Sequence, residues 1–410
     1  MAKTYKFGNG TWATKKNSTL AYSDTNNAFK PLPFSFERNS IATRVNKEGL
    51  IEVVSNDVPR IDYTDSADGA LLLENSRSNL YTYSEDFGIG TYTSSLITYS
   101  SNTLDVLSPK GDNSSDKFTV TTSSGDANRR ITKSISVQDF TASIYVKGEV
   151  GQKFHLFVAR DSYAELKNGY FTCNGEWQRF SFSDTFSTTS TSVVIGLEFG
   201  WTSDDSIAND IYYLWGAQLE QGNLSSYIPT NGSTVQRAAE TCNGSGNSEV
   251  FNDSEGVLMA EISALDNGGL SKRISLTDES GTVNNRVSLE LDEIAGTVKV
   301  FMVSNSVLVG QITITNINQT QNNKIAIKYN ISSLDLYING FLQETNNTIS
   351  SMPIGLSSLF FSESEGSFPF YGNTKEIAYY DTVLTDEELE YMTSYRSLNE
   401  MVTELNLNAL

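Results

Sequence analysis

Residues 81–239 contain successive apolar runs of strand length and no stretch with useful helical periodicity. In FTASIYVK, alternate residues from Phe140 to Val146 are apolar, and alternate residues of a strand point to one face. Eight such runs recur at intervals typical of a β-sandwich. They are Asp116–Thr122, Ile131–Val137, Phe140–Lys147, Lys153–Ala159, Gly169–Cys173, Trp177–Ser183, Ser192–Phe199 and Ile211–Leu219. The pattern predicts one β-sandwich domain over residues 81–239.

A second block of strands covers residues 255–396, and Asn339-Gly340 within it is a strong hairpin signal. Thr385 and Glu388 form a capping-box pattern that predicts a short helix near the end of this block, before a tail at residues 397–410. The candidate strands are Gly256–Ala264, Ser271–Thr277, Asn285–Asp292, Thr297–Val303, Val307–Thr315, Asn323–Asn330, Ser333–Ile338, Leu356–Ser362 and Gly372–Tyr380. The fold class is therefore all-β, with two sandwiches and a short C-terminal helix.

The segment at residues 240–254, ETCNGSGNSEVFNDS, is rich in Gly, Ser and Asn, and this composition predicts a linker between the two sandwiches. Residues 1–80 have a different character. Their apolar runs, Leu50–Val54, Val58–Tyr63 and Ala70–Leu73, are short and separated by turn-forming clusters.

An isolated ribbon of such short strands is marginal in water, so it needs a neighbouring subunit, the next domain, or both. Both downstream blocks have enough strands to close their own sandwiches. We therefore expect residues 1–80 to serve attachment and oligomerisation. Deleting residues 1–75 is expected to leave two folded β-domains.

The formal net charge of −20, without a Lys/Arg cluster, argues against nucleic acid as a partner. Cys173 and Cys242 are far apart and are expected to be free thiols, as in a reducing cytoplasm. The first residues have no apolar signal core, and no apolar run is long enough to predict a membrane span.

The residue types that carry common catalysis are sparse. His155 is the single histidine, and no Gly-x-Ser-x-Gly turn supplies a nucleophile for it. The 49 acidic residues make chance carboxylate pairs inevitable, and we single out Glu198, flanked by Leu197 and Phe199, and Glu290, within SLELD, as mid-strand acids. We predict no enzymatic activity.

Metal sites are equally hard to place in the sequence. No Cys/His cluster has zinc spacing. Calcium is possible at the loop acids Asp204-Asp205, Asp210 and Asp253–Glu255, but their spacing is not diagnostic, so we predict no cofactor.

Glycan-binding β-sandwiches use exposed aromatic rings that stack on sugar faces. Trp201, after a predicted strand, and Tyr163, in RDSYAEL, are the best-placed loop aromatics. Both are candidate glycan-binding residues, although packing in a core or an interface is the alternative for each.

Several stretches resemble known families. FERNSIATRVNKEGLIEVVSNDVPRIDY with GALLLENSRSNL resembles a segment of bacteriophage appendage proteins, the head or tail fibres and spikes. NLYTYSEDF, SIYVKGE, WQRFSF and YYLWGAQLEQ resemble a carbohydrate-binding-module-like jelly roll, which implies that Trp177 and Trp215 are core residues. GVLMAEI, LDLYINGFLQ and KEIAYYDTVLTDEELEYMTSY are similar to a laminin-G or concanavalin-like lectin domain.

These resemblances imply a virion protein made in the host cytoplasm. They imply a homotrimer that attaches to other virion proteins through residues 1–80 and binds host surface glycans. A polysaccharide depolymerase and a purely structural decoration or joining protein are the alternatives.

Overall fold

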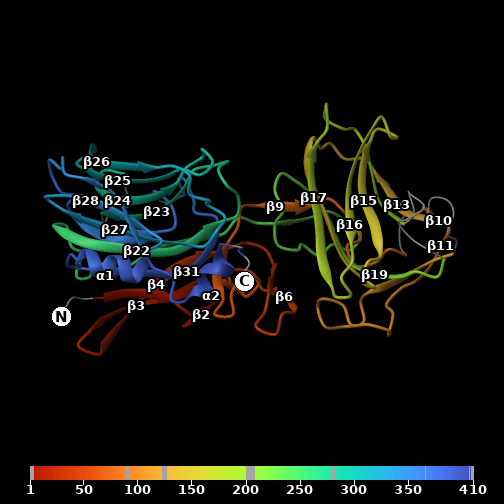
Figure 1. The fold of residues 1–410 in the computed structure, drawn as a ribbon, viewed down its shortest axis with the longest axis horizontal. Helices are drawn as coiled ribbons and strands as arrows, with labels where there is room; N and C mark the ends of the chain where they lie inside the picture. Colours follow the sequence, from red (N-terminus) through yellow and green to blue (C-terminus); the bar gives the residue numbers. More distant parts are fainter. Residues whose placement is uncertain are drawn as a thin grey trace. The chain divides into compact units, whose positions relative to one another are not determined.

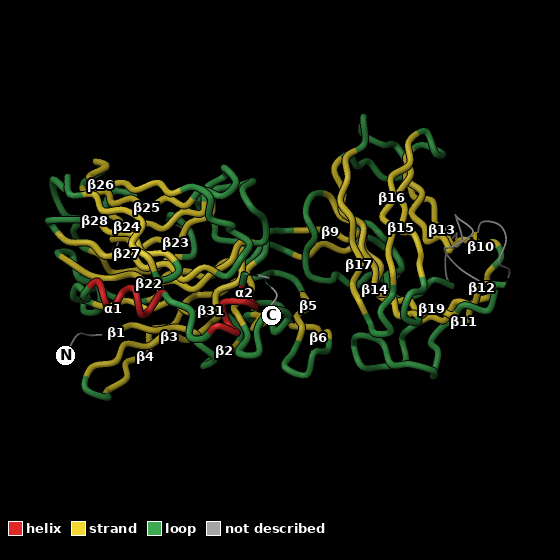
Figure 2. The backbone as a smooth tube through the Cα atoms, viewed as in Figure 1, coloured by secondary structure: helices red, strands yellow, loops and turns green. Residues whose placement is uncertain are grey.

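The computed structural model describes residues 4–88, 93–121, 127–199, 208–278, 283–364, 366–405 and 407. The chain divides into two compact units, each built from strands (Figures 1 and 2). Unit 1 comprises Met1–Asn39, Val54–Asn75 and Ala239–Leu410, and unit 2 comprises Ser40–Val53 and Ser76–Ala238. The all-β prediction is confirmed, but this division differs from the expected boundaries. The expected region 1–80 is shared between the units instead of forming a part of its own.

Unit 2 is a sandwich of two five-stranded sheets. One sheet has the order β10 (Thr93–Ser95), β13 (Ala127–Lys133), β18 (Val193–Phe199), β15 (Lys153–Arg160) and β16 (Glu165–Thr172). The other has the order β11 (Ile97–Ser100), β12 (Asp116–Val120), β19 (Ile211–Gln221), β14 (Asp139–Gly148) and β17 (Gln178–Thr185). A short pair, β9 (Arg77–Asn79) and β20 (Val235–Arg237), completes the unit. All eight strands predicted for this block are present.

The core of unit 2 lies between these sheets and is rich in phenylalanine, including Phe118, Phe140 and Phe154. Trp215 is fully buried but packs elsewhere, in a small cluster with Ile51 and Tyr227. Ile51 belongs to the hairpin of β5 (Ala42–Val45) and β6 (Ile51–Val54), so this hairpin, as far as Val53, belongs to unit 2. Trp177, also expected in the core, is half-buried, and its indole N–H donates to the Leu107 carbonyl at 2.8 Å.

Unit 1 forms one continuous hydrogen-bonded ladder that folds into two layers around a single core. One part runs β29 (Phe341–Asn346), β28 (Leu334–Ile338), β27 (Asn323–Asn330), β22 (Glu255–Ala264) and β31 (Gly372–Tyr380). The ladder continues through β1 (Thr4–Gly8), β3 (Ser18–Thr25) and β4 (Ala28–Glu37). It ends with β21 (Thr241–Ser245), β30 (Leu356–Phe360), β23 (Lys272–Asp278), β24 (Arg286–Leu291), β25 (Val298–Ser304) and β26 (Val307–Ile314).

The N-terminal strands are therefore part of unit 1. β1 pairs with β31, and β4 connects β3 to β21. Tyr5, Phe7, Phe34 and Phe36 are buried in the same core as the C-terminal strands. A short strand, β2 (Thr14–Lys15), pairs with β3, while β7 (Arg60–Asp62) pairs with β8 (Ala70–Leu73), which joins β31. Unit 1 needs the N-terminal region to complete its core, contrary to the expectation that its sandwich closes without it.

A buried ion cluster holds three distant segments of unit 1 together. Arg38 and Arg60 both contact the carboxylate of Glu240, with 2.7 Å between Arg38 Nη1 and Glu240 Oε1. Arg60 Nη2 also lies 2.8 Å from Glu74 Oε2. Arg38 Nη2 donates to the Ser55 carbonyl at 2.6 Å. All four charged side chains are almost completely buried.

The predicted linker at residues 240–254 is an ordered part of unit 1. It contains Glu240 of the ion cluster and strand β21, and Val250 and Phe251 lie in the core. Its Gly, Ser and Asn residues favour turns as well as linkers, and here Val250 and Phe251 supply the apolar anchor that composition alone understates.

The C-terminal elements agree with the sequence. Asn339 and Gly340 have φ values of 51° and 89°, as a type I′ hairpin turn requires. Helix α1 (Asp386–Thr393) begins at Thr385 with the predicted capping box to Glu388, and α2 (Leu398–Glu404) follows in the expected tail. In the described part of the chain, neither helix has the length and apolar character to cross a membrane.

Candidate functional site

Tyr163 lies in the turn between β15 and β16, and this turn has an unusual backbone. Asp161, Ser162 and Tyr163 have φ values of 49°, 59° and 69°, in the left-handed region that side chains disfavour. Asp161 offsets this cost, because its Oδ1 accepts hydrogen bonds from Thr191 N and Thr191 Oγ1, both at 2.9 Å. The turn therefore holds Tyr163 in one place.

Hydrogen bonds also keep the carboxylates of this turn charged. The Thr191 backbone N–H, followed by its hydroxyl, lowers the pKa of Asp161 to about 2. Glu165, at the start of β16, accepts from the Ser187 hydroxyl at 2.7 Å and from Arg160 Nε at 3.0 Å. These partners, the Ser187 hydroxyl first, lower the pKa of Glu165 to about 2.

The ring of Tyr163 covers the outer face of the sheet, the face opposite the core. Along β15, Phe154, Leu156 and Val158 point into the core, so His155 and Phe157 point outward. The centre of the Tyr163 ring lies 6.2 Å from the centre of the Phe157 ring. Phe157 is buried beneath it, whereas Tyr163 is 43% exposed.

Arg130 on β13 fixes the free edge of the same ring. Its Nη1 donates to the Tyr163 hydroxyl at 2.8 Å, and its guanidinium carbon lies 5.7 Å from the ring centre. Because one ring edge is hydrogen-bonded and the other is packed on Phe157, the ring is held in one orientation and loses little entropy when a ligand binds.

A second exposed aromatic ring lies on the same face. Tyr170 on β16 is opposite His155 in the register, and the two ring centres are 4.1 Å apart. Tyr170 is 62% exposed, while His155 is only 2% exposed and lies opposite the buried Glu198 on its other side. Tyr170 thus shields His155, which is buried.

The strands that form this face, β13, β15 and β16, are labelled in Figure 1. The face offers two fixed aromatic rings with polar groups between them. The Tyr170 ring packs on His155 and the Tyr163 ring packs on Phe157. His155 and Phe157 are two positions apart on β15, so their Cα atoms are roughly 7 Å apart. Asn168 lies opposite Phe157 on β16, between the two tyrosines in the register. Exposed aromatic faces beside amide and guanidinium donors suit the mixed apolar and hydroxyl surface of a sugar.

Trp201, the other predicted binding residue, lies outside the described residues. The sequence pointed to Tyr163 as a candidate but not to Tyr170 or Arg130, which lie within strands on the same face. Alternation contained a signal for Tyr170, because a large aromatic at an outward position of an edge strand is exposed unless something covers it.

One of the acids considered for metal binding, Asp253, has a structural role. Asp253 accepts hydrogen bonds from Gly355 N at 2.7 Å and Leu356 N at 2.8 Å. Asp204 and Asp205 lie outside the described residues. Within the described ranges, no group of three or more His, Cys, Asp or Glu side chains is arranged to hold a metal ion.

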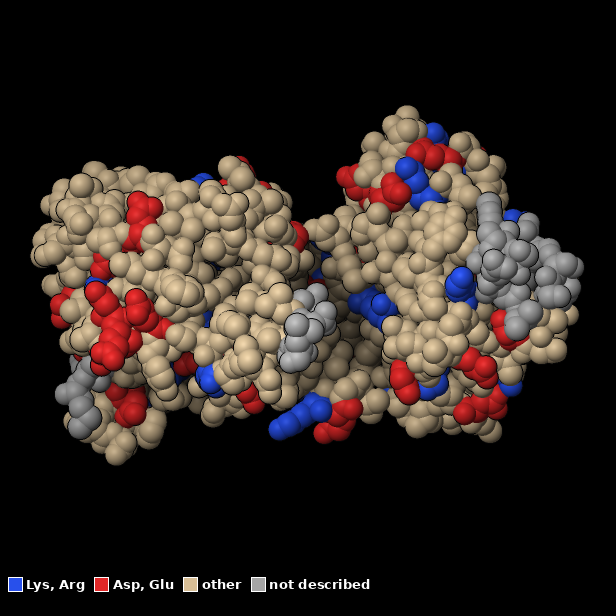
Figure 3. All heavy atoms as spheres, viewed as in Figure 1, with Lys and Arg blue, Asp and Glu red and all other residues tan. Residues whose placement is uncertain are grey.

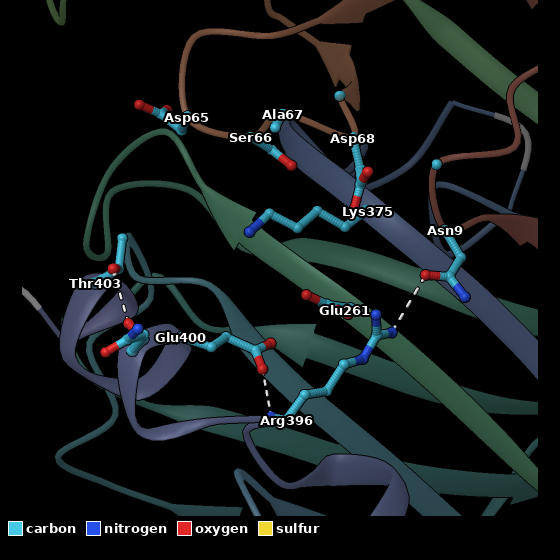
Figure 4. A pocket seen from close by; sticks show the side chains of 13 residues that line it. Asn9, Asp65, Ser66, Ala67, Asp68, Glu261, Lys375, Arg396, Glu400 and Thr403 are labelled. Carbon is cyan, nitrogen blue, oxygen red and sulfur yellow. Dashed lines mark hydrogen bonds between the residues drawn. The ribbon is translucent and has the colours of Figure 1, made fainter.

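A polar hollow of about 380 Å³ in unit 1 brings together residues that are distant in sequence (Figure 4). Lys375, Arg396 and Glu261 all line it, and Arg396 Nη2 donates to Asn9 Oδ1 at 3.2 Å. Glu261 lies opposite Glu376 in the register of β22 and β31. Burial raises the pKa of Glu376, and Lys6, 3.7 Å away, opposes that effect.

Charged side chains are spread widely over the surface that Figure 3 shows. On the face drawn in Figure 3, acidic side chains are spread over both units, and the described Lys and Arg side chains are scattered among them. Cys173 and Cys242 are buried free thiols, as expected, and burial raises the pKa of Cys173 to about 11.

No protein-family model matches the sequence, and no curated protein matches it. Among solved structures, the CBM40 module of a Ruminococcus gnavus IT-sialidase, bound to α2,3-sialyllactose, is 17% identical, with a TM-score of 0.32 over 37% of this chain and 94% of that chain. A leech intramolecular trans-sialidase is 16% identical, with a TM-score of 0.29 over 38% of this chain and 26% of that chain. Mouse laminin α1 domains LG4-5 are 10% identical, with a TM-score of 0.22 over 61% and 85%.

Proposed function

We propose that this chain is a glycan-binding protein and that the outer face of unit 2 is a binding site. One observation carries the proposal: Tyr163 and Tyr170 are exposed on one sheet face, yet each ring is held by a neighbour. A ring that is already ordered and partly exposed can stack on a sugar without the cost of immobilising it. Arg130 and Asn168 supply donors beside the rings for hydroxyl groups.

We further propose that the protein is an appendage of a phage particle, as a fibre or spike that contacts host surface glycans. The resemblance of the segments quoted above to phage appendage proteins supports this proposal. A homotrimer would present three copies of the face, and multivalency would compensate for weak single sites. Attachment to other virion proteins would use surfaces of the N-terminal region that remain exposed after its strands have joined the two units.

Binding of the full-length protein to an array of bacterial surface glycans tests the glycan-binding proposal. Tyr163→Ala and Tyr170→Ala should each weaken binding about fivefold, because one aromatic contact contributes about 1 kcal/mol. Tyr391→Ala is the matched control, since Tyr391 is 83% exposed on α1 of unit 1. Equal binding by all three variants would contradict the proposed site.

The depolymerase alternative has one observation in its favour. Glu261 and Glu376 are cross-strand neighbours, and such pairs have Cβ atoms about 4.5–5.5 Å apart. Side chains from such positions can bring their carboxyl groups to the roughly 5–5.5 Å that a retaining glycosidase uses. Incubation of host polysaccharide with the protein and with Glu376→Gln decides the matter: shortening of the polymer by the native chain alone would establish the enzyme.

A further inference from the structure

In unit 1, strands β23, β24, β25 and β26 have a sheet face that points away from the core. This face carries a different set of side chains from the face of unit 2 that carries Tyr163 and Tyr170. Core residues alternate along these strands, so the residues between them point outward. The register aligns Arg273, Glu290 and Lys299 in one row and places Phe301 in the next. These side chains, with Arg286 and Gln311, line a groove of about 440 Å³, which we call the basic groove.

Carboxylates beneath the cations hold the basic groove together. Arg273 Nε lies 2.6 Å from Glu290 Oε2, and its Nη1 lies 2.5 Å from Glu363 Oε1. Arg286 Nη2 lies 2.9 Å from the same Glu363 oxygen. Lys299 is paired with Asp292.

The layering of charge decides which sign a ligand meets. The side chains of Glu290, Glu363 and Asp292 are 3%, 9% and 2% exposed, whereas those of Arg273, Arg286 and Lys299 are 15%, 12% and 29% exposed. The carboxylates therefore lie deeper and orient the cations, which form the outer layer. On a chain with a net charge of −20, the more exposed partner of each of these ion pairs is the cation.

Aromatic rings support the two guanidinium groups. The guanidinium carbon of Arg273 lies 4.0 Å from the centre of the Phe368 ring and 4.9 Å from that of Phe301. Arg286 lies over Phe301 at 5.2 Å. Stacking of this kind holds a guanidinium in one plane and leaves the N–H groups at its edge free to meet acceptors in that plane, beginning with Glu290 and Glu363.

The hydrogen-bonding capacity of the two arginines is not fully used by their two carboxylate partners, Glu290 and Glu363. Both use the same oxygen of Glu363, and the Arg286 Nε atom is buried without a hydrogen-bond acceptor. Burial lowers the pKa of Arg286, and the positive charge of Arg273 acts in the same direction against Glu363. An additional anion would offset both effects.

We propose that the basic groove binds an acidic sugar through the carboxylate of the sugar. This binding is independent of the outer sheet face of unit 2 that carries Tyr163 and Tyr170, which we call the tyrosine face. A guanidinium fork pairs with a carboxylate through two parallel hydrogen bonds, and Phe301 and Gln311 provide an apolar surface and an amide for the sugar ring. A phosphate group has related chemistry, so the test must separate the two anions.

Calorimetric titration of the full chain with an oligoglucuronate tests the proposal, with the carboxyl-reduced neutral oligosaccharide as the matched ligand. We expect binding of the acidic form that weakens with salt, and at least tenfold weaker binding of the neutral form, because charge-assisted hydrogen bonds contribute about 1.5–3 kcal/mol. Equal binding of both forms would overturn the proposal. Competition by inorganic phosphate at the same concentration as glucuronate would also overturn the assigned ligand class.

Arg286→Gln should weaken oligoglucuronate binding about tenfold, and Lys299→Gln provides a second variant that leaves the Arg–Glu363 contacts in place. Lys328→Gln is the control, since Lys328 is also 15% exposed but pairs with Asp335 and Asp386. Unchanged binding by both groove variants would contradict the site. The double variant Tyr163→Ala/Tyr170→Ala should retain oligoglucuronate binding, and loss there would assign the ligand to unit 2.

Discussion

Residues Ser40–Val53 and Val54–Asn75 follow one another in the sequence, yet opposite chemistry holds them in place. The first segment is held by apolar packing, with Ile51 against Trp215 and Tyr227 in unit 2. The second is held by buried charge, with Arg60 between Glu240 and Glu74 in unit 1. The change occurs within the single strand β6, between Val53 and Val54.

This difference shows why a ribbon with strands too short for a core of its own is stable. The segment Ser40–Val53 is part of unit 2 and the segment Val54–Asn75 is part of unit 1, so each segment is as stable as the unit that it completes. An apolar contact tolerates small changes of shape, whereas a buried charge that loses its partner incurs the full cost of its desolvation. The two halves should therefore respond differently to substitution.

The largest effect is expected from deleting residues 1–37, which removes β1 to β4 and leaves both halves of the ribbon in the chain. Unit 1 should lose protection from hydrogen exchange throughout its core, because Tyr5, Phe7, Phe34 and Phe36 are missing. Unit 2 serves as the internal control and should remain protected. A protected unit 1 in this variant would show that its sandwich closes without the N-terminal strands.

Glu240→Gln should destabilise unit 1 by about 3–5 kcal/mol, because it leaves two buried arginines without full charge compensation. Denaturant-dependent hydrogen exchange of peptides from each unit measures the change. Glu249→Gln is the control, since its pair with Lys30 is about 70% exposed and should contribute less than about 1 kcal/mol. Equal effects of the two substitutions would remove the distinction between buried and exposed pairs.

Ile51→Ala should destabilise unit 2 by about 2–3 kcal/mol, through lost packing and the cavity left beside Trp215. The neighbouring Leu50→Ala is a close control, because Leu50 is 38% exposed. Tryptophan fluorescence should shift in the Ile51 variant if Trp215 becomes accessible. An unshifted spectrum with native stability would contradict the apolar account of this half.

Ser114→Ala should have a smaller effect on the same cluster. The Trp215 indole N–H donates to Ser114 Oγ at 2.9 Å, and an unsatisfied buried donor costs about 1–2 kcal/mol. The comparison with the exposed Asn113→Ala isolates this hydrogen bond. The midpoint of urea unfolding measures both variants, and identical midpoints would show that water replaces the serine.

Acid should weaken ligand binding at the tyrosine face, because it acts on the turn between β15 and β16 that holds Tyr163. The pKa values of Asp161 and Glu165 are lowered to about 2 in the folded turn, so their stabilising contribution is complete above their ordinary values near pH 4. It is lost as the pH falls from about 4 towards 2. Ligand binding that depends on Tyr163 should be constant from pH 7 to pH 4 and decline below that, and Asp161→Asn should flatten the decline. A decline beginning at pH 6 would implicate another group.

Alternation and turn chemistry were sufficient to predict most strands of residues 116–219 and 256–380, the three short runs of the ribbon, the hairpin at Asn339-Gly340 and the cap at Thr385. They did not predict β1, β3 and β4, which lie in the first 37 residues. They could not predict which unit each run joins. Arg38 and Arg60 meet Glu240 across 202 and 180 residues, and nothing in the local pattern around Glu240 distinguishes it from a solvated acid. The same limit applies to the basic groove, whose cations become neighbours only through the register of β23, β24 and β25.

The division of the chain has a consequence for how binding specificity can change through evolution. Residues Ser76–Ala238 resemble an exchangeable cassette, since both flanking segments belong to unit 1. Recombination at those two boundaries alone would separate Trp215 from the Ile51 hairpin that covers it. A donor cassette must therefore accept the resident hairpin or bring its own. Gradual substitution on the outer sheet faces is the easier path to a new binding surface, because it leaves both buried clusters intact.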